Sequence, residues 1–310
     1  MSKYLKVSII VPVYNGGNHF RNCVSSLLGI NFPVEQLQVI LINDGSQDDT
    51  SQWLFEQKLS PNFEIITHTD NRGRAAARNS GLKKAKGDII IFLDADMVIN
   101  SDFVTEHIKA ISRPEVAAVS GLVIANPNER KTSLQNYLFK YRKRGAKQLG
   151  EKNPIPFKYL ITNNMSVKRK VVEKCGIFDE IYIGYGGEDT DYAIRLWELY
   201  PNGLRFSSSA VSIDCQNETL YDLQVKMNKY GSTNYLRLLD RYPDYTKELA
   251  GDWIATIKGK VVFNPAINFL VKLIYFIIPV PYFVRYSIAY SLIMGARNPE
   301  EGIPKFQSKR

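Results

Sequence analysis

Cysteine is scarce in this chain, and its start has no long hydrophobic run. The three cysteines, Cys23, Cys175 and Cys215, are too few and too scattered for a disulfide framework or a zinc cluster. A reduced, cytosolic protein is the simplest interpretation. The first residues, MSKYLKVSIIVPVYN, contain no long apolar stretch before their first polar break, so they predict a strand and not a signal peptide. No internal repeat and no nucleic-acid-binding motif is recognisable, so nucleic acid is not an expected partner.

What the chain has in quantity is apolar residues and positive charge. With 310 residues, of which 45% are hydrophobic and 23% charged, it can bury a sizeable core. The formal net charge is +9. A basic chain of this kind favours an anionic partner, which could be nucleic acid, a phosphate-bearing ligand or an anionic membrane surface, and charge alone does not choose among them.

Apolar strands alternate with helical stretches through the first part of the chain. Strands are predicted at Val7–Val13, Leu37–Ile42, Phe63–Thr67, Ile89–Leu93 and Val116–Ile124. This alternation predicts βαβ units and an α/β fold with a mostly parallel sheet. Ligands of such sheets bind beyond the carboxyl ends of the strands. The polar pairs Tyr14-Asn15 and Asn43-Asp44 and the triplet Asp94-Ala95-Asp96 all follow strand ends, which makes that edge the candidate site.

The triplet Asp94-Ala95-Asp96 places two carboxylates at the end of a buried strand. One interpretation is a solvated turn that ends the strand, because Asp is a good turn residue. The other is a divalent cation, which needs hard oxygen ligands. The triplet alone favours the turn, so the rest of the chain has to decide.

The C-terminal part changes character. Residues Pro127–Pro156 are polar and basic and predict a surface excursion, whereas VVFNPAINFLVKLIYFIIPVPYFVRYSIAYSLIMGA is strongly apolar. Neither half of that stretch offers about 20 apolar residues without a charge, as a spanning helix needs. Two amphipathic helices at a membrane surface fit better. Packing on the main domain, or a homodimer interface, is the alternative, and we assign 221–310 to a helical extension of one of these kinds.

Four stretches together resemble family 2 glycosyltransferases of the GT-A fold. In chain order they are VSIIVPVYNGG, VILINDGSQDDT, DNRGRAAARNSGLKKAKGDIIIFLDADM and GYGGEDTDYAIRL. The GGED stretch is also similar to the C-terminal region of β-1,4-galactosyltransferases and of polymerising chondroitin-type enzymes. The resemblance implies a GT-A nucleotide-diphospho-sugar transferase fold over residues 1–220. It divides that domain into a nucleotide-sugar-binding half (1–125) and an acceptor-binding half (126–220).

The resemblance implies a metal and a nucleotide at the strand ends. Transfer from a nucleotide-sugar leaves negative charge on a diphosphate, which Mn²⁺ or Mg²⁺ stabilises. By resemblance, Asp96 is the direct metal ligand and Asp94 the ribose-side partner. Asp44 is expected to accept the uracil N–H, although capping a helix or forming a turn would also explain it.

Further donor and acceptor contacts are implied on both sides of the site. Pro12, Tyr14 and Asn15 are expected to line the base and ribose, although Asn15 could simply order its own turn. Two other sets follow from the resemblance. Arg74 and Arg78 are expected to contact the diphosphate, and the alternative is that they are surface arginines on a solvated helix face. Asn163 and Asn164 are expected to contact the donor or the acceptor.

The GGED stretch carries the implied acceptor chemistry. An inverting transfer needs a base for the attacking hydroxyl, and by resemblance Asp189 is that base and Glu188 holds an acceptor hydroxyl. Gly187 leaves room for the substrate. The alternative is that these acids only cap the helix predicted at Tyr192–Tyr200.

One departure from the resembled family concerns the metal. Related GT-A enzymes often take a third ligand from a histidine past the GGED helix, but His19, His68 and His107 all lie in the first half of this chain. Asp214 stands about where that histidine would lie, and it is either a substitute oxygen ligand or a strand-end residue.

The sequence therefore predicts an inverting, metal-dependent transferase that moves a sugar from a UDP-sugar to a saccharide or lipid-linked acceptor. Its expected role is the synthesis of a cell-surface polysaccharide or glycolipid. Its expected location is cytoplasmic, peripheral at the inner face of the cell membrane. A non-catalytic nucleotide-binding scaffold is the alternative, and the intact DAD and GGED stretches argue against it.

Overall fold

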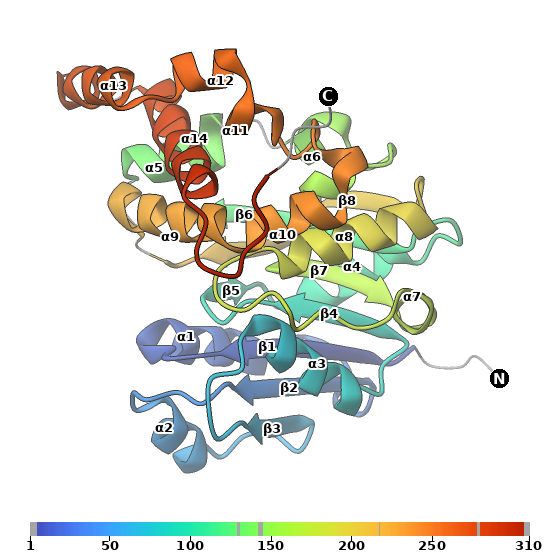
Figure 1. Ribbon diagram of the computed structural model, residues 1–310. Coiled ribbons are helices and arrows are strands. Elements are labelled where there is room, and N and C mark those ends of the chain that lie inside the picture. Colours follow the sequence, from blue (N-terminus) through green and yellow to red (C-terminus); the bar gives the residue numbers. More distant parts are fainter. Residues whose placement is uncertain (1–4, 129–130, 142–144, 217, 278–279, 307–310) are drawn as a thin grey trace. The chain divides into compact units, whose positions relative to one another are not determined.

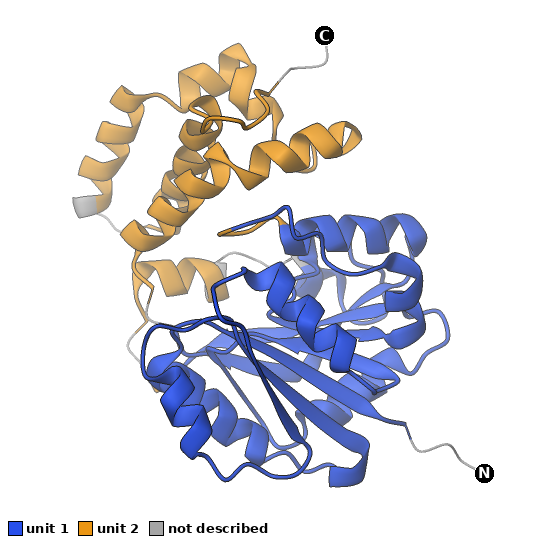
Figure 2. Cartoon of the chain, turned by 60° about the horizontal axis from the view of Figure 1, so that its bottom comes forward, with its two compact units in different colours: residues 1–126, 144–183, 188–216 blue, residues 127–143, 184–187, 217–310 orange. Residues whose placement is uncertain are grey.

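The structure is a computed structural model that describes residues 5–128, 131–141, 145–216, 218–277 and 280–306. The chain forms two compact units, coloured separately in Figure 2. Unit 1 comprises Met1–Asn126, Arg144–Ile183 and Glu188–Gln216, and unit 2 comprises Pro127–Lys143, Gly184–Gly187 and Asn217–Arg310. The chain passes from unit 1 to unit 2 for the last time after Gln216, close to the boundary predicted at residue 220. Two internal segments also belong to unit 2.

Unit 1 is built on one eight-stranded sheet, in the order β3-β2-β1-β4-β7-β6-β8-β5 (Figure 1). Its strands are β1 (Val7–Val13), β2 (Leu37–Asn43), β3 (Phe63–Thr67), β4 (Ile89–Leu93), β5 (Met97–Ile99), β6 (Ala118–Ala125), β7 (Asn164–Lys168) and β8 (Leu204–Asp214). Neighbours from β3 to β4 are parallel, and so are β6 and β8. β7 is antiparallel to both β4 and β6, and β5 is antiparallel to β8. The sheet is therefore mixed, with its parallel half built from the first four strands.

The helices of unit 1 connect successive strands in the sequence and pack on the sheet. They are α1 (Gly17–Leu28), α2 (Thr50–Glu56), α3 (Arg74–Lys84), α4 (Phe103–Ile111), α6 (Gly145–Leu149), α7 (Arg169–Cys175) and α8 (Glu188–Leu199), with short 3₁₀ turns η1 (Val34–Gln36) and η3 (Phe157–Tyr159). All five residues of β4 are buried, as are all of β2 except Gln38. Strands buried on both faces read as continuous apolar runs, which is why they were visible in the sequence.

The close approach of α3 to the sheet positions a charged residue in the interior. Ala75, Ala76 and Ala77 are buried, and a Cβ added at Gly81 would lie 2.5 Å from Cγ2 of Ile10. Small side chains thus allow this helix to lie tightly on β1 and β2. The following residue, Arg78, is consequently also buried, with 2% of its surface exposed.

Unit 2 is helical. It contains α5 (Ser133–Gln135), a π-helical turn η2 (Asn136–Tyr141), α9 (Leu220–Ser232), α10 (Asn234–Arg241), η4 (Pro243–Tyr245), α11 (Asp252–Ala255), α12 (Ile257–Val262), α13 (Pro265–Ile277) and α14 (Pro281–Arg297). The surface excursion predicted at Pro127–Pro156 thus contains α5, η2 and α6, and residues 129–130 and 142–144 within it lie outside the described residues.

Two devices hold the helices of unit 2 together. α9 and α14 cross so closely that a Cβ at Gly231 would lie 2.2 Å from the carbonyl oxygen of Leu292. The guanidinium of Arg297 donates to the backbone carbonyls of Trp253, Ile254 and Phe263 and so ties α11 and the end of α12 to α14.

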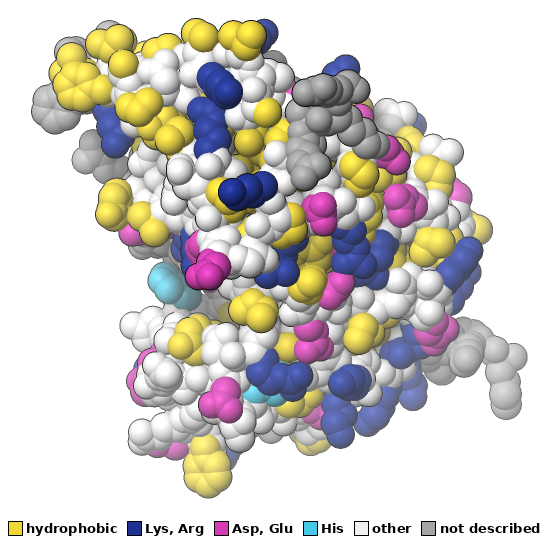
Figure 3. Space-filling model, viewed as in Figure 1, with side chains coloured by type: hydrophobic (Ala, Val, Ile, Leu, Met, Phe, Trp, Pro, Cys, Tyr) yellow, Lys and Arg dark blue, Asp and Glu magenta, His cyan; other side chains and the backbone are white. Residues whose placement is uncertain are grey.

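The segment around α13 leaves apolar side chains in solvent. Phe269, Leu270, Leu273 and Ile274 are 67%, 54%, 52% and 42% exposed, and Figure 3 shows hydrophobic side chains gathered over α13. Within the described ranges, no helix has the length and apolarity required to cross a membrane. The helix α13 therefore has an exposed apolar face.

Candidate active site

The expected metal-binding carboxylates meet at one edge of the sheet of unit 1. Asp94 and Asp96 lie in the turn between β4 and β5, and Met97 pairs with Asp214 at the end of β8. The backbone N–H of Cys215 donates to the carbonyl oxygen of Asp96 over 3.1 Å. The pairing of these two strands thus brings Asp214 beside Asp96, although 118 positions separate them in the sequence.

Asp96 carries a buried oxygen without a partner. Its Oδ1 is inaccessible to solvent and accepts no hydrogen bond in the structure. Burial, together with repulsion from Asp94 and Asp214, raises the pKa of Asp96 to about 7. A buried, crowded carboxylate oxygen is a poor arrangement by itself, but it suits a divalent cation that prefers oxygen ligands. Across the part of the chain described, no three ligating side chains form a complete metal site by themselves.

Arg78 links this edge to the first turn of α8. Its guanidinium donates to Oδ1 of Asp94 over 3.0 Å and to Oε1 of Glu188 over 2.9 Å. The Arg78 and Glu188 side chains are 2% and 4% exposed. Burial works against the charge of Arg78, but attraction to Asp94 and Glu188 outweighs it, so the pKa of Arg78 is raised. The alternative of a solvated surface arginine is thus wrong for Arg78.

The two carboxylates of the GGED stretch have different surroundings. Glu188 is buried, and its Oε2 has no hydrogen-bond partner. Oδ1 of Asp189 accepts the N–H of Thr190 over 2.8 Å. Burial and the neighbouring Glu188 raise the pKa of Asp189 to about 6, although the positive charges of Arg78 and Arg74 act in the opposite direction. A carboxylate with this pKa is ionised at neutral pH and can still accept a proton, as a general base must.

Arg74 stands at the start of α3 with an exposed side chain. Its charge lowers the pKa of both Asp96 and Asp189, so it lies within electrostatic reach of both. The positive charge of Arg74 therefore acts on both the expected metal ligand and the expected base.

Asp44 is buried and holds the backbone that precedes α3. Its Oδ1 accepts the N–H of Arg72 over 3.0 Å and its Oδ2 that of Gly73 over 2.8 Å. His68 contacts the same Oδ1 through Nδ1 at 2.6 Å. A carboxylate has about four lone-pair positions. These three bonds therefore leave one position for the predicted uracil N–H.

The loop after β1 lies against the loop after β2. Oδ1 of Asn15 accepts the N–H groups of Gln47 and Asp48 over 2.7 and 3.3 Å, and Asn15 itself has a φ of +51°. The side chain of Asn15 therefore orders these turns. Pro12 is half-buried and Tyr14 is 44% exposed, so Tyr14 is open to a ligand.

The two asparagines before β7 differ sharply. Asn163 is half-buried, and its carbonyl accepts the N–H of Asp94 over 3.2 Å, so it borders the site. Asn164 is fully buried and bonds to His107, Leu122, Ala210 and Ser212. Its amide is committed to joining strands inside the sheet. The expectation that Asn164 contacts substrate is corrected accordingly.

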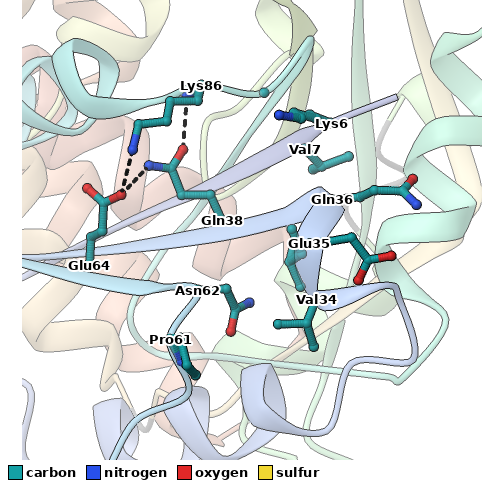
Figure 4. A pocket seen from close by; sticks show the side chains of 12 residues that line it. Lys6, Val7, Val34, Glu35, Gln36, Gln38, Pro61, Asn62, Glu64 and Lys86 are labelled. Carbon is teal, nitrogen blue, oxygen red and sulfur yellow. Dashed lines mark hydrogen bonds and ion pairs between the residues drawn. The ribbon is translucent and has the colours of Figure 1, made fainter. Parts of the chain in front are cut away.

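A cavity of about 340 Å³ lies elsewhere in unit 1, at the amino ends of β1 and β2 (Figure 4). Its polar side chains satisfy one another: Glu64 accepts from Gln38 over 2.8 Å and from Lys86 over 3.3 Å. None of the predicted site residues lines it. The cavity therefore lacks the convergent, partner-free groups that mark the carboxyl edge.

Three residues near the site were missed in the sequence. Asn79 clamps the segment before α8, since its amide accepts from Phe178 N and donates to Phe178 O and Glu180. His68 and Ser80 form a chain of contacts behind Asp44. Asn79 directly follows the candidate residue Arg78, but nothing local to His68 marked it.

The comparison with known proteins decides the family. The model described as "Glycosyl transferase family 2" matches residues 8–176. This chain belongs to glycosyl transferase family 2. It is 32% identical over 251 residues to the uncharacterised glycosyltransferase YfnE of Bacillus subtilis, covering 65% of this chain and 62% of that protein. It is 34% identical over 130 residues to the poly-β-1,6-N-acetyl-D-glucosamine synthase of Staphylococcus epidermidis, covering 41% and 30%. This family 2 chain thus spans less than two thirds of the length of these relatives.

Solved structures support the GT-A fold of this family 2 chain. The mannosyltransferase PcManGT of Pyrobaculum calidifontis, in complex with GDP-Man and Mn²⁺, is similar with a TM-score of 0.62 at 17% identity, covering 96% of this chain and 88% of that one. TarS 1–349 of S. aureus in complex with UDP-GlcNAc is similar with a TM-score of 0.56 at 15% identity, covering 98% and 99%. The expected fold class is therefore confirmed.

The buried position of Arg78 predicts a large stability loss when its charge is removed. Arg78→Met should lower the free energy of unfolding by about 3 to 5 kcal/mol, because it leaves Glu188 buried without a counter-charge. Arg72→Met is the matched control. Arg72 is 52% exposed and contacts Glu180 over 3.4 Å, so its loss should cost less than about 1 kcal/mol. Urea unfolding measures both, and equal losses would contradict the role given to Arg78.

Proposed function

We propose that this chain is an inverting, metal-dependent glycosyltransferase. It moves a sugar from a UDP-sugar to a saccharide or lipid-linked acceptor in the synthesis of a cell-surface polysaccharide or glycolipid. The observation that carries the proposal is the buried ion-pair chain Asp94–Arg78–Glu188. It holds Asp94, on the expected nucleotide side, and Glu188, on the expected acceptor side, in a fixed arrangement. Catalysis by positioning of reactants requires such an arrangement.

The names of similar proteins support the substrate class. One relative is a synthase of poly-β-1,6-N-acetyl-D-glucosamine, and TarS 1–349 was solved with UDP-GlcNAc and with UDP. Asp44 keeps a lone-pair position for an imide N–H, which uracil offers. A UDP-sugar is therefore the donor we expect.

The metal would be held at the carboxyl edge of the sheet. Asp96 offers its partner-free Oδ1, Asp94 and Asp214 lie close enough to raise the pKa of Asp96, and PcManGT was solved with Mn²⁺. Mn²⁺ or Mg²⁺ bound there would stabilise the negative charge of the departing diphosphate. Arg74 adds a positive charge on the same side.

The acceptor step belongs to α8. The ionised carboxylate of Asp189 takes the proton from the acceptor hydroxyl while the oxygen of that hydroxyl forms a bond to the anomeric carbon of the donor sugar. The bond between the anomeric carbon and the diphosphate oxygen breaks on the opposite face. Attack opposite to the leaving group inverts the anomeric centre. The buried, partner-free Oε2 of Glu188 suits a second acceptor hydroxyl, while Arg78 holds its other oxygen. Burial of this kind excludes water from the proton transfer.

The function is tested by UDP release from a panel of UDP-sugars with Mn²⁺ and saccharide acceptors. Release should rise with pH through about 6 and level off above it, because Asp189 has to be ionised to act as the base. Asp189→Asn should lower the turnover by about 100-fold or more.

Asp191→Asn is the control for this experiment. Asp191 lies in the same helical turn but is fully buried and bonds to Arg195, so its loss should affect stability more than the pH profile. A protein that binds UDP yet releases none from any donor would instead be the nucleotide-binding scaffold. A protein that binds no uridine nucleotide would refute both.

The metal assignment predicts a distinct effect at Asp214. Asp214→Ala should raise the Mn²⁺ concentration needed for half-maximal activity by about tenfold, since one carboxylate beside Asp96 is lost. The measurement is a Mn²⁺ titration of UDP release. Asp102→Ala, a change in the turn before α4, is the control and should leave the titration unchanged. An unaltered requirement in Asp214→Ala would remove Asp214 from the metal site.

We propose in addition that unit 2 attaches the protein to the inner, cytoplasmic face of the cell membrane. The proposal is supported by the exposed apolar side chains of α13 and by the exposed lysines Lys258, Lys260 and Lys272 in and beside it. Apolar side chains flanked by basic ones suit an anionic lipid surface. A homodimer that covers the same surface is the competing occupant.

Membrane attachment predicts loss of lipid binding when α13 is made polar. The double variant Phe269→Ser, Leu273→Ser should no longer sediment with anionic liposomes, whereas wild type should. Phe55→Ser is the matched control, because Phe55 on α2 is 92% exposed and lies in unit 1. Should wild type stay in the supernatant and elute as a dimer that the double variant breaks, the surface is a subunit interface.

A further inference from the structure

A buried histidine stands behind Asp44. Nδ1 of His68 lies 2.6 Å from Oδ1 of Asp44, and its Nε2 lies 2.8 Å from Oγ of Ser80. The side chains of His68 and Asp44 are 7% and 5% exposed. The backbone N–H of His68 donates to the carbonyl oxygen of Asn43, the residue before Asp44. Both ends of the imidazole and its backbone are therefore fixed.

The hydrogen bonds around Asp44 and His68 indicate which ring nitrogen of His68 donates to Asp44. Asp44 accepts two backbone N–H groups besides the contact from His68, so both of its carboxyl oxygens act as acceptors. Nδ1 of His68 consequently carries hydrogen and donates to Asp44. Nε2 of His68 contacts the hydroxyl of Ser80 over 2.8 Å.

The contacts from Asp44 through His68 to Ser80 join three elements of unit 1, at the strand ends where the nucleotide is expected. Asp44 follows β2, His68 follows β3 and Ser80 lies in α3. Through Arg72 and Gly73, Asp44 also holds the backbone where α3 begins, two residues before Arg74. The imidazole and these two backbone N–H groups together fix the direction of the Asp44 carboxylate, and with it the direction of its remaining lone pair.

We propose that His68, supported by Ser80, is a positioning residue that gives this site its preference for a base with an imide N–H. The inference rests on the proposed function, in which Asp44 accepts that N–H. A carboxylate fixed from behind presents one oxygen to the base and cannot rotate to suit another pattern of donors and acceptors. The preference is therefore built into the interior as much as into the residues that touch the nucleotide.

The same three residue types activate the serine of many hydrolases, but the setting here differs. Ser80 lies inside α3, where the neighbouring backbone N–H groups form the helix and are not free to stabilise an oxyanion. The chain is thus suited to orientation and not to nucleophilic attack.

The test compares the affinities of UDP and CDP, measured by calorimetry without any sugar transfer. Uracil carries N3–H, whereas cytosine has an unprotonated N3 at the same place. Wild type should prefer UDP. His68→Phe, which keeps a ring but loses both nitrogens, should weaken UDP about tenfold or more while changing CDP much less. His68→Asn retains a donor near the position of Nδ1 and should recover most of the preference.

The outcomes separate this inference from the proposed function. A wild type that binds neither nucleotide, or that shows no preference, overturns the donor assignment and this inference with it. A wild type that prefers UDP, together with a His68→Phe variant of unchanged preference, overturns the role of His68 alone. Should His68→Phe fail to fold by circular dichroism, Ser80→Ala decides: a reduced UDP-to-CDP preference supports the proposal, and an unchanged one overturns it.

Discussion

The buried guanidinium of Arg78 is the interaction on which the rest of the site depends. Several carboxylates gather at one edge of the sheet, and bringing negative charges together in a poorly solvated place is unfavourable. Arg78 compensates two of them at once and ties them to each other. Two buried oxygens keep no hydrogen-bond partner, namely Oδ1 of Asp96 and Oε2 of Glu188, and these are the atoms to which we assign a cation and a substrate hydroxyl. The protein thus neutralises its own framework and keeps the remaining oxygens for ligands.

The fold produces this arrangement with ordinary means. The alanines of α3 allow the helix to lie tightly on the sheet, which takes the next residue, Arg78, into the interior. The antiparallel strand β7 then separates β4 from β6, and β8 returns beside β5. That return is what brings Asp214 to Asp96. Strand pairing, and not proximity in the sequence, therefore assembles the carboxylates.

The sequence predicted the parts of the fold whose signal is local. Strands β1 and β4 were located to the residue, because strands buried on both faces are nearly continuous apolar segments. The three-residue β5 was missed, since so short a strand depends on its partner β8. The burial of Asn164 and the contact of His68 with Asp44 were also out of reach, because both arise from residues far apart in the chain. Asp189 and Asp96 were selected by resemblance, and the structure added the burial that raises the pKa of each.

The discontinuity of unit 2 has a consequence for how the molecule is made. Gly186 is held by Asn234, whose amide donates to its carbonyl over 2.8 Å, and the ring of Tyr230 lies against it. Gly231 in turn meets α14, which starts at Pro281. During synthesis, the glycine segment before Glu188 leaves the ribosome about 50 residues ahead of its first partner and about 100 ahead of α14. At about 5 to 20 residues per second, that segment waits for several seconds before its packing is complete. The glycine segment of unit 2 is thus among the last parts of a nascent chain to complete its packing, and a chain that ends before α9 would lack its partners.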